Sequence, residues 1–223
     1  MPKHFDLEIE KLKKKTLYLS AIVEEVVQKA FKAFEERNPK VAKEIIEGDI
    51  EIDRIEVDLE EDCLKVLALY QPVASDLRYI TSIIKINNEL ERIGDLATNI
   101  SKTTITLSMA EKLVFQLDFK QMANKTRDML RLSLDALMRM DVKLAYTVIA
   151  TDDEVDIMKH RIIDLIKNEI KKDPDKVDTL LYLLSVPRFL ERIGDHATNI
   201  AENIIYVLEG EIVRHRFDNT KPE

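Results

Sequence analysis

The sequence predicts an all-α protein that consists of two pseudo-symmetric three-helix bundles, and three observations lead to this prediction. The composition combines 45% hydrophobic and 34% charged residues with only 4 Gly and 6 Pro, as is typical of long amphipathic helices. The sequence ELERIGDLATNI at residues 89–100 returns as FLERIGDHATNI at residues 189–200. Around both copies, apolar residues recur at steps of three and four, which is the period of one helix face. An internal repeat on this scale indicates two copies of one structural unit, with six long helices in all.

Prolines and helix-capping residues divide the first half of the chain into three expected helices. The first covers residues 5–37 and ends at Asn38. A proline follows Asn38 and suits a first helical turn, so Asn38 is expected to cap a second helix over residues 39–70. This helix stops before Pro72, because the residue before a proline disfavours helical geometry. A third helix, over residues 75–110, holds the first copy of the motif.

The second half divides in the same way. A fourth helix is expected over residues 118–140, and Asp141 is expected to cap a fifth, which ends at Pro174. The sixth covers residues 175–208 and holds the second copy of the motif. It stops at Gly210, since glycine favours the end of a helix. Each half is therefore expected to be a three-helix unit.

The two halves correspond beyond the motif, and this correspondence sets the expected domain boundaries. Lys40 heads the second helix and Lys143 heads the fifth, 103 residues later, whereas the motif copies are 100 residues apart. The second copy therefore lacks three residues, which we expect to be missing from its last interhelical turn. The predicted units are residues 1–112, residues 113–212 and a C-terminal tail, residues 213–223.

Acidic residues four positions apart occur at matching places in the two halves. Residues four apart lie on one face of a helix, so each pair presents two carboxylates together. Like charges this close raise one another's pKa, and a hard, multivalent cation relieves the conflict. Oxygen ligands suit iron, manganese, magnesium or calcium, and two converging pairs have room for more than one ion. We therefore predict a metal cluster in each half. The ligand pairs are Asp49/Asp53 with Glu91/Asp95, and Asp152/Asp156 with Glu191/Asp195.

An apolar seam runs beside the motif acids on the third and sixth helices. Its alternating steps of three and four predict that it faces the core, so each acid cluster is expected at the edge of its bundle. Gly94 and Gly194 lie inside the motif helices, where each costs about 1 kcal/mol relative to alanine. They are expected either to let a neighbouring helix come close or to leave room for something bound beside the carboxylates. The seam of the third helix consists of Ile83, Ile86, Leu90, Ile93, Ala97 and Ile100. The seam of the sixth helix consists of Leu183, Val186, Leu190, Ile193, Ala197, Ile200, Ile204 and Val207. A similar apolar stripe on the second helix contains Ile45, Ile52, Leu59 and Val66.

The alternative to a metal site is a structural ion-pair network, in which the acids pair with Arg92, Arg78 or lysines. The positions of Arg92 and Arg192 on their helices predict that both point away from the acids and make interhelical ion pairs. His160 extends the acidic row of the fifth helix by one turn and is a weaker candidate ligand, because Val57 holds the matching place in the first half.

Composition and missing motifs argue against several classes of protein. A formal net charge of -8 does not suit a general nucleic-acid surface. Cys63 is the only cysteine, which rules out an intrachain disulfide and fits a reducing compartment. The sequence shows no apolar run of about 20 residues for a membrane span, no signal-peptide core and no catalytic triad, phosphate loop or HExxH motif. Histidine never follows glutamate by three residues, unlike in ferritin-like di-iron bundles. We expect a soluble, cytoplasmic protein.

The repeated motif, together with the segment QPVASDLR at residues 71–78, resembles the PhoU family. The resemblance covers nearly the whole chain. It implies two three-helix bundles that hold multinuclear metal clusters on their surface, iron in some members, through E/DxxxD motifs that match the four acidic pairs. Phe189 replaces an acid often found two residues before the motif glutamate, and Pro187 and Arg188 change the approach to the second copy. The two clusters are therefore expected to differ in affinity or nuclearity.

The same resemblance implies a function. Members are negative regulators of phosphate uptake and of phosphate-starvation signalling, and act with the ATP-binding subunit of the phosphate transporter and with a phosphate-sensing histidine kinase. We expect a metal-binding adaptor without catalysis, whose clusters contain divalent or trivalent metal, with iron, zinc, manganese and magnesium as candidates. Direct binding of phosphate at open coordination positions is a further hypothesis. A carboxylate-bridged metalloenzyme, such as a di-iron oxidase or a phosphatase, and a metal-free scaffold are the alternatives. The oligomeric state, a homodimer included, stays open.

Overall fold

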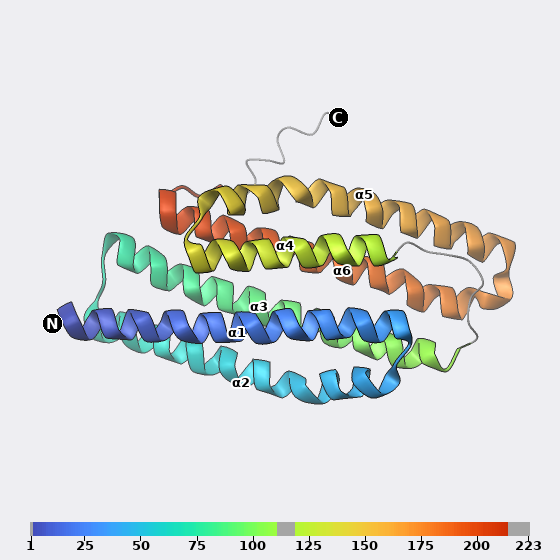
Figure 1. Ribbon diagram of the computed structural model, residues 1–223, viewed down its shortest axis with the longest axis horizontal. Coiled ribbons are helices and arrows are strands. Elements are labelled where there is room, and N and C mark those ends of the chain that lie inside the picture. The colour runs from blue at the N-terminus through green and yellow to red at the C-terminus, as the bar shows by residue number, and fades with distance from the viewer. Residues whose placement is uncertain (1, 111–118, 214–223) are drawn as a thin grey trace.

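The computed structural model describes residues 2–110 and 119–213, which form long α-helices and one short 3₁₀ turn (Figure 1). These elements confirm the predicted all-α fold of paired three-helix bundles. The first bundle contains α1 (Pro2–Glu36), α2 (Pro39–Tyr70) and α3 (Ala74–Ser108). The second contains α4 (Phe119–Arg139), α5 (Val142–Lys172) and α6 (Val177–Glu209), with the 3₁₀ turn at Pro174–Lys176.

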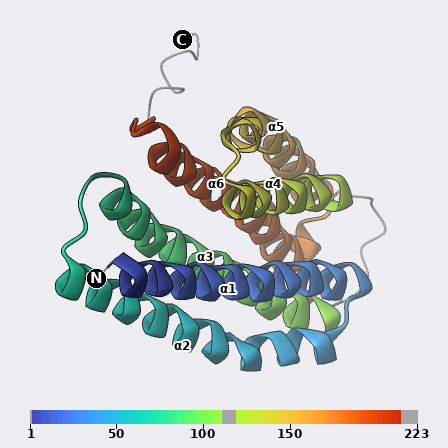
Figure 2. The ribbon, with the colours of Figure 1, turned by 60° about the vertical axis from the view of Figure 1, so that its left-hand side comes forward.

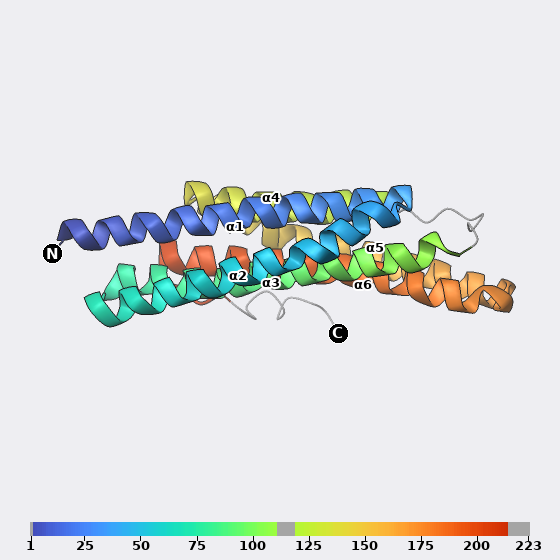
Figure 3. The ribbon, with the colours of Figure 1, turned by 90° about the horizontal axis from the view of Figure 1, so that it is seen from below.

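The two bundles lie side by side. The sequence alone does not distinguish this arrangement from end-to-end packing. Helix α3 packs against α6, and α1 packs against α4 (Figure 2). Seen from below, α1 and α4 run along one side of the elongated molecule and α3 and α6 along the other (Figure 3). The α2–α3 turn and the α5–α6 turn lie at opposite ends (Figure 1). This arrangement brings the two motif helices, α3 and α6, into direct contact at the centre of the protein.

The predicted helix caps are confirmed by their hydrogen bonds. Asn38 Oδ1 accepts from the main-chain nitrogens of Lys40 and Val41 at 3.1 and 3.3 Å. Asp141 Oδ1 does the same for the two matching amides of α5, at 2.9 and 3.4 Å. Gly210 ends α6 with φ 75°, in the left-handed region that glycine adopts without strain. These local signals set most of the helix boundaries.

Some boundaries differ from the prediction. Helix α1 already begins at Pro2, and α6 begins at Val177, because the residues after Asp173 first form a 3₁₀ turn. Three predicted features fall on residues outside those that the structure describes. They are the start of the fourth helix at residue 118, the boundary between residues 112 and 113, and the tail from residue 214 onward.

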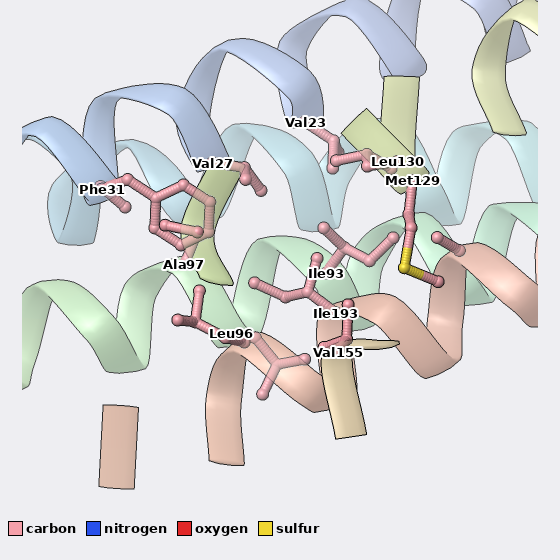
Figure 4. Packing of buried hydrophobic residues seen from close by; sticks show 14 of the residues in the cluster. Val23, Val27, Phe31, Ile93, Leu96, Ala97, Met129, Leu130, Val155 and Ile193 are labelled. Carbon is pink, nitrogen blue, oxygen red and sulfur yellow. The ribbon is translucent and has the colours of Figure 1, made fainter. Parts of the chain in front are cut away.

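One apolar core continues from one bundle into the other. In Figure 4, Val23 and Val27 of α1, Ile93 of α3, Met129 of α4 and Ile193 of α6 gather in a single cluster of buried side chains. The predicted seam residues of α2, α3 and α6 are buried, apart from the half-buried last member on α6. Because the core is shared, the two repeats stabilise each other.

A second, smaller core fills the end of the first bundle near the α2–α3 turn. It consists of Leu12, Leu59, Cys63, Val66, Ile80 and Ile83. Burial raises the pKa of the Cys63 thiol to about 12, so this cysteine serves as an apolar packing residue.

None of the described helices combines the length and the apolarity that crossing a membrane requires.

Candidate metal centre

The predicted acids of the first half share one face of the α2–α3 pair. Asp49 and Asp53 project from α2, and Glu91 and Asp95 project from α3. Partial burial is the largest cause of the raised pKa of Asp49, and the charges of Asp53 and of Asp95 across the pair raise it further. The pKa of Glu91 is raised in the same way, first by burial, then by the charge of Asp95, with a contribution from Asp53. The two acidic rows therefore face each other and repel.

Gly94 allows the two rows to come this close. A Cβ atom at this position would lie 3.0 Å from Ile52 Cδ1 of α2 and 3.9 Å from Asp49 Oδ1. At Gly194, by contrast, the nearest atoms are those of Met129 at 3.7 Å, an ordinary contact. Of the two explanations that the sequence offers, a closely approaching helix therefore applies to the first half only.

Two buried oxygen atoms in the first cluster lack a hydrogen bond within the described part of the chain. Glu91 Oε2 is one, although the Arg92 guanidinium lies 3.4 Å away. Thr98 Oγ1 is the other; this residue is 3% exposed and lies beside Asp49, without a hydrogen bond of good geometry between them. Buried polar atoms in native proteins normally have a partner, so both oxygens retain hydrogen-bonding capacity.

The predicted direction is wrong for the first motif arginine. Arg92 does not point away from the acids. Its Nη1 donates to Asp95 Oδ2 at 3.2 Å, and its Nε lies 3.4 Å from Glu91 Oε2 on the same helix. Arg192 makes no interhelical ion pair with any residue that the structure describes. The reason is that the long arginine side chain can fold back along its own helix, where partners three residues away lie within reach.

The acids of the second half also face one another, across α5 and α6. The pKa of Asp195 is raised to about 6, chiefly by partial burial and then by the charges of Glu191, Asp152 and Asp156. The pKa of Asp152 is also raised, chiefly by burial and then by the charge of Asp156. Thr198 Oγ1 donates a hydrogen bond to Asp152 Oδ1 at 3.4 Å. This face reproduces the first cluster in its carboxylates.

The second cluster contains a lysine that sequence reasoning missed. Lys159 Nζ donates to Asp156 Oδ1 and to Glu191 Oε1, both at 2.8 Å, and so joins α5 to α6. Two of the four acids of the second cluster, Asp156 and Glu191, thus form an ion-pair network with a lysine. Such a network is the alternative to a metal site that the sequence also permits. The offset of 103 residues places Lys159 on Glu56, so this difference is visible in the sequence once the two helices are aligned.

His160 is not drawn into the second cluster. It is exposed, and its Nδ1 lies 2.8 Å from the main-chain oxygen of Asp156 rather than from a carboxylate. The ring is therefore engaged with the backbone of its own helix.

A polar cavity of about 360 Å³ adjoins the first cluster between α2, α3 and α6. Glu56 and Glu60 line it from α2, and Glu89 lines it from α3. Glu89 Oε2 lies 2.6 Å from His196 Nδ1 and accepts a hydrogen bond from Asn199 Nδ2 at 3.1 Å. This contact ties one motif helix to the other.

The donor set of the first cluster fits a hard cation, since it consists of carboxylate and hydroxyl oxygens with unmet hydrogen-bonding capacity. In residues 2–110 and 119–213, no three His, Cys, Asp or Glu side chains are arranged as the ligand shell of a single ion. The acids of each half thus share a face, and in the second half Asp156 and Glu191 are paired with Lys159.

Comparison with known proteins agrees with the repeat seen in the fold. Residues 17–104 and 119–204 each match the PhoU domain. A phosphate-specific transport system accessory protein PhoU homologue from Aquifex aeolicus is 38% identical over 216 residues, which cover 97% of this chain and 98% of the relative. The accessory protein PhoU of Escherichia coli is 32% identical over 211 residues, which cover 95% of this chain and 88% of the relative.

Solved structures show the same similarity. The crystal structure of PhoU from Pseudomonas aeruginosa superposes with a TM-score of 0.90 at 33% identity, over 93% of this chain and 100% of that one. The phosphate transport system regulatory protein PhoU from Streptococcus pneumoniae gives a TM-score of 0.87 at 29% identity, over 94% of this chain and 99% of that one. With a PhoU domain in each of its three-helix bundles, the chain belongs to the PhoU family.

Proposed function

We propose that this chain is an accessory regulator of phosphate transport that lowers phosphate uptake when phosphate is plentiful. The observation that carries the proposal is the similarity, over nearly the full length of both chains, to accessory proteins of phosphate-specific transport. The names of these relatives describe accessory and regulatory proteins, so the proposed role is regulation without a catalytic step. The protein would act in the cytoplasm, where the ATP-binding subunit of the transporter and a phosphate-sensing histidine kinase would be its partners.

Metal binding by the acid clusters is the second part of the proposal. Asp49, Asp53, Glu91 and Asp95 would hold metal in the first half, and Asp152, Asp156, Glu191 and Asp195 are the candidates in the second. Support comes from the mutual repulsion of the facing acids and from the two unsatisfied oxygens of the first cluster. A bound iron, manganese, zinc or magnesium ion would supply positive charge that phosphate oxygens can approach. Ligation would require the carboxylates to turn towards one another.

The regulatory role can be tested in a bacterium that lacks its own PhoU protein. We expect expression of this chain to lower the uptake of radiolabelled phosphate by cells grown in high phosphate. A variant with Glu91→Gln and Asp95→Asn should fail to do so. A matched control, Glu47→Gln with Glu51→Gln, removes two exposed acids of the same spacing from the opposite face of α2 and should act like the wild type. Unchanged uptake with the wild-type chain present at normal levels would contradict the proposed regulation.

Metal content is tested on purified protein by elemental analysis for iron, zinc, manganese and magnesium. We expect bound metal in the wild-type protein and in the Glu47→Gln/Glu51→Gln control. The Asp95→Asn/Asp195→Asn variant should lose it while circular dichroism shows unchanged helix content. If the wild-type protein retains no metal and takes up none on incubation with these ions, the acids serve a metal-free scaffold. Heat released on adding phosphate to the metal-loaded protein, and not to the metal-free protein, would support direct binding of phosphate.

A further inference from the structure

The two acid clusters differ in charge at one aligned position. Helices α2 and α5 correspond at an offset of 103 residues, which places Asp49 on Asp152, Asp53 on Asp156 and Glu56 on Lys159. No gap interrupts these helices, so the third pair occupies equivalent places one turn along. The first cluster thus has an additional carboxylate where the second has an ammonium group.

Lys159 joins a carboxylate of α5 to a carboxylate of α6 in the second cluster. Its Nζ lies 2.8 Å from a carboxylate oxygen on each of the two helices, Asp156 Oδ1 on α5 and Glu191 Oε1 on α6. The lysine side chain is only 15% exposed and that of Glu191 is 22% exposed. Charge-assisted hydrogen bonds of this length, in a partly desolvated place, are among the stronger polar contacts in proteins.

Among the described residues, no cation forms ion pairs with both helices of the first cluster, although the charge of Lys102 on α3 lowers the pKa of Asp49. Arg92 pairs only with Glu91 and Asp95 of its own helix, and its side chain is 52% exposed. Neither Asp49 nor Asp53 forms an ion pair with a residue in the described ranges. Within the described residues, the facing carboxylates of the first half are therefore not joined by an ion pair from one helix to the other.

The two clusters also differ in the hydrogen bonds that their matching side-chain oxygens form. In the second half, the hydroxyl of Thr198 is bonded to Asp152 and a carboxylate oxygen of Glu191 is bonded to Lys159. In the first half, the matching Thr98 hydroxyl, almost fully buried, lies beside Asp49 without a hydrogen bond of good geometry, and Glu91 Oε2 lies 3.4 Å from the Arg92 guanidinium of its own helix, also without one. Buried oxygens without a well-formed hydrogen bond are thus found in the acid cluster that has no bridging lysine.

We propose that the first cluster is the principal metal site of this chain, and that Lys159 acts as a built-in cation which weakens metal binding to the second. The inference rests on the proposed metal-binding function and specifies how that function is divided between the halves. A metal ion at the second cluster must displace an ammonium group that already satisfies two carboxylates. At the first cluster it meets carboxylates, a hydroxyl, a solvent-exposed guanidinium and the more distant charge of Lys102, and no described cation there is paired with both helices.

The test is a titration of metal-free protein with MnCl₂, followed by calorimetry and by the electron paramagnetic resonance signal of free Mn²⁺. We expect one class of strong binding in the wild-type protein. Asp95→Asn should weaken this class at least about tenfold, equivalent to about 1.4 kcal/mol. Asp195→Asn, the matched change in the second half, should leave it unchanged. Lys159→Glu, which gives the second cluster the residue found in the first, should add a second class of strong sites.

Lys159→Met separates the loss of the internal cation from the gain of a ligand, and should strengthen Mn²⁺ binding to the second half by less than Lys159→Glu does. Circular dichroism and thermal unfolding establish that each variant is folded. Equal weakening by Asp95→Asn and Asp195→Asn, or no added Mn²⁺ in folded Lys159→Glu and Lys159→Met, would overturn the asymmetry while the metal-binding function stands. Failure of the wild-type protein to bind Mn²⁺ or iron would overturn both.

Discussion

Glu89 on α3 and His196 on α6 meet across the boundary between the two bundles, with Glu89 Oε2 2.6 Å from His196 Nδ1. Both side chains are largely buried, 19% and 17% exposed. Glu89 precedes the first motif glutamate by two residues, and His196 directly follows the second motif aspartate. In the second half, Phe189 stands where Glu89 would be, so the link exists in one copy only. The repeat is thus asymmetric at the interface as well as at the acid clusters.

Removing this link should weaken the association of the two bundles. We expect Glu89→Ala to lower the free energy of unfolding by about 1–3 kcal/mol, because it leaves His196 and Asn199 without an acceptor in a partly buried place. Urea denaturation measures the change. Glu44→Ala, at an exposed position of α2, is the control and should change stability by less than about 0.5 kcal/mol. A double-mutant cycle with His196→Ala that gives no coupling energy would show that the contact contributes nothing.

The two motif glycines should respond differently to the same substitution. Gly194→Ala is expected to raise the free energy of unfolding by up to about 1 kcal/mol, since alanine favours the helix and the new Cβ meets its neighbours at ordinary distances. Gly94→Ala gains the same helix propensity but places its Cβ 3.0 Å from buried Ile52. Overpacking of this kind costs about 1–3 kcal/mol, so the net effect should be neutral to destabilising. Equal shifts of the unfolding midpoint in the two variants would contradict the close approach of α2 and α3.

The lone cysteine should be unreactive in the folded protein. Cys63 is fully buried, and burial raises the pKa of its thiol to about 12, so almost no thiolate exists near neutral pH. We expect no labelling by iodoacetamide, measured by mass spectrometry, in native protein, and complete labelling in urea. A Cys63→Ala/Leu64→Cys variant moves the thiol to a neighbouring position that is 53% exposed and should be labelled without urea. Rapid labelling of native wild-type protein would mean that the small core near the α2–α3 turn opens readily.

Helix positions and the apolar seams could be predicted from the sequence because both depend on local signals. Asn38 and Asp141 cap helices by bonding amides two and three residues ahead, an interaction that any context permits. The acid faces were also predictable, since a spacing of four residues fixes which side of a helix a residue occupies. The packing of one bundle on the other was not, because it depends on which of several apolar faces remains available after each bundle has formed.

The details of the candidate site required the structure for a different reason. Spacing gives the direction of Cα–Cβ, whereas Arg92 and Lys159 have long side chains whose ends lie far from that direction. Arg92 returns to the acids of its own helix, and Lys159 crosses from α5 to α6. The substitution of Glu56 by Lys159 between the repeats was present in the sequence, but its meaning depended on knowing that Glu191 faces this position.

The acid cluster of the second half should give the metal-free protein a characteristic dependence on pH. The pKa of Asp195 is raised to about 6 in the folded protein, mainly by partial burial and then by the charges of Glu191, Asp152 and Asp156, from an ordinary value of 3.8. Between these two values the folded state binds more protons than the unfolded state. The stability associated with protonated Asp195 is therefore present at low pH, is lost as the pH rises through about 6, and changes little above that.

Asp195→Asn removes this titration, so the variant should gain stability relative to the wild type as the pH increases. We expect the difference in free energy of unfolding between the two, measured by urea denaturation with a chelator present, to be larger at about pH 7.5 than at about pH 4.5. Asp58→Asn, which removes an exposed carboxylate from α2, should differ from the wild type by the same amount at both values. If Asp195→Asn behaves like Asp58→Asn, then Asp195 is ionised in the folded protein throughout this range. Partial burial and the charges of Glu191, Asp152 and Asp156 would then not raise its pKa as far as about 6.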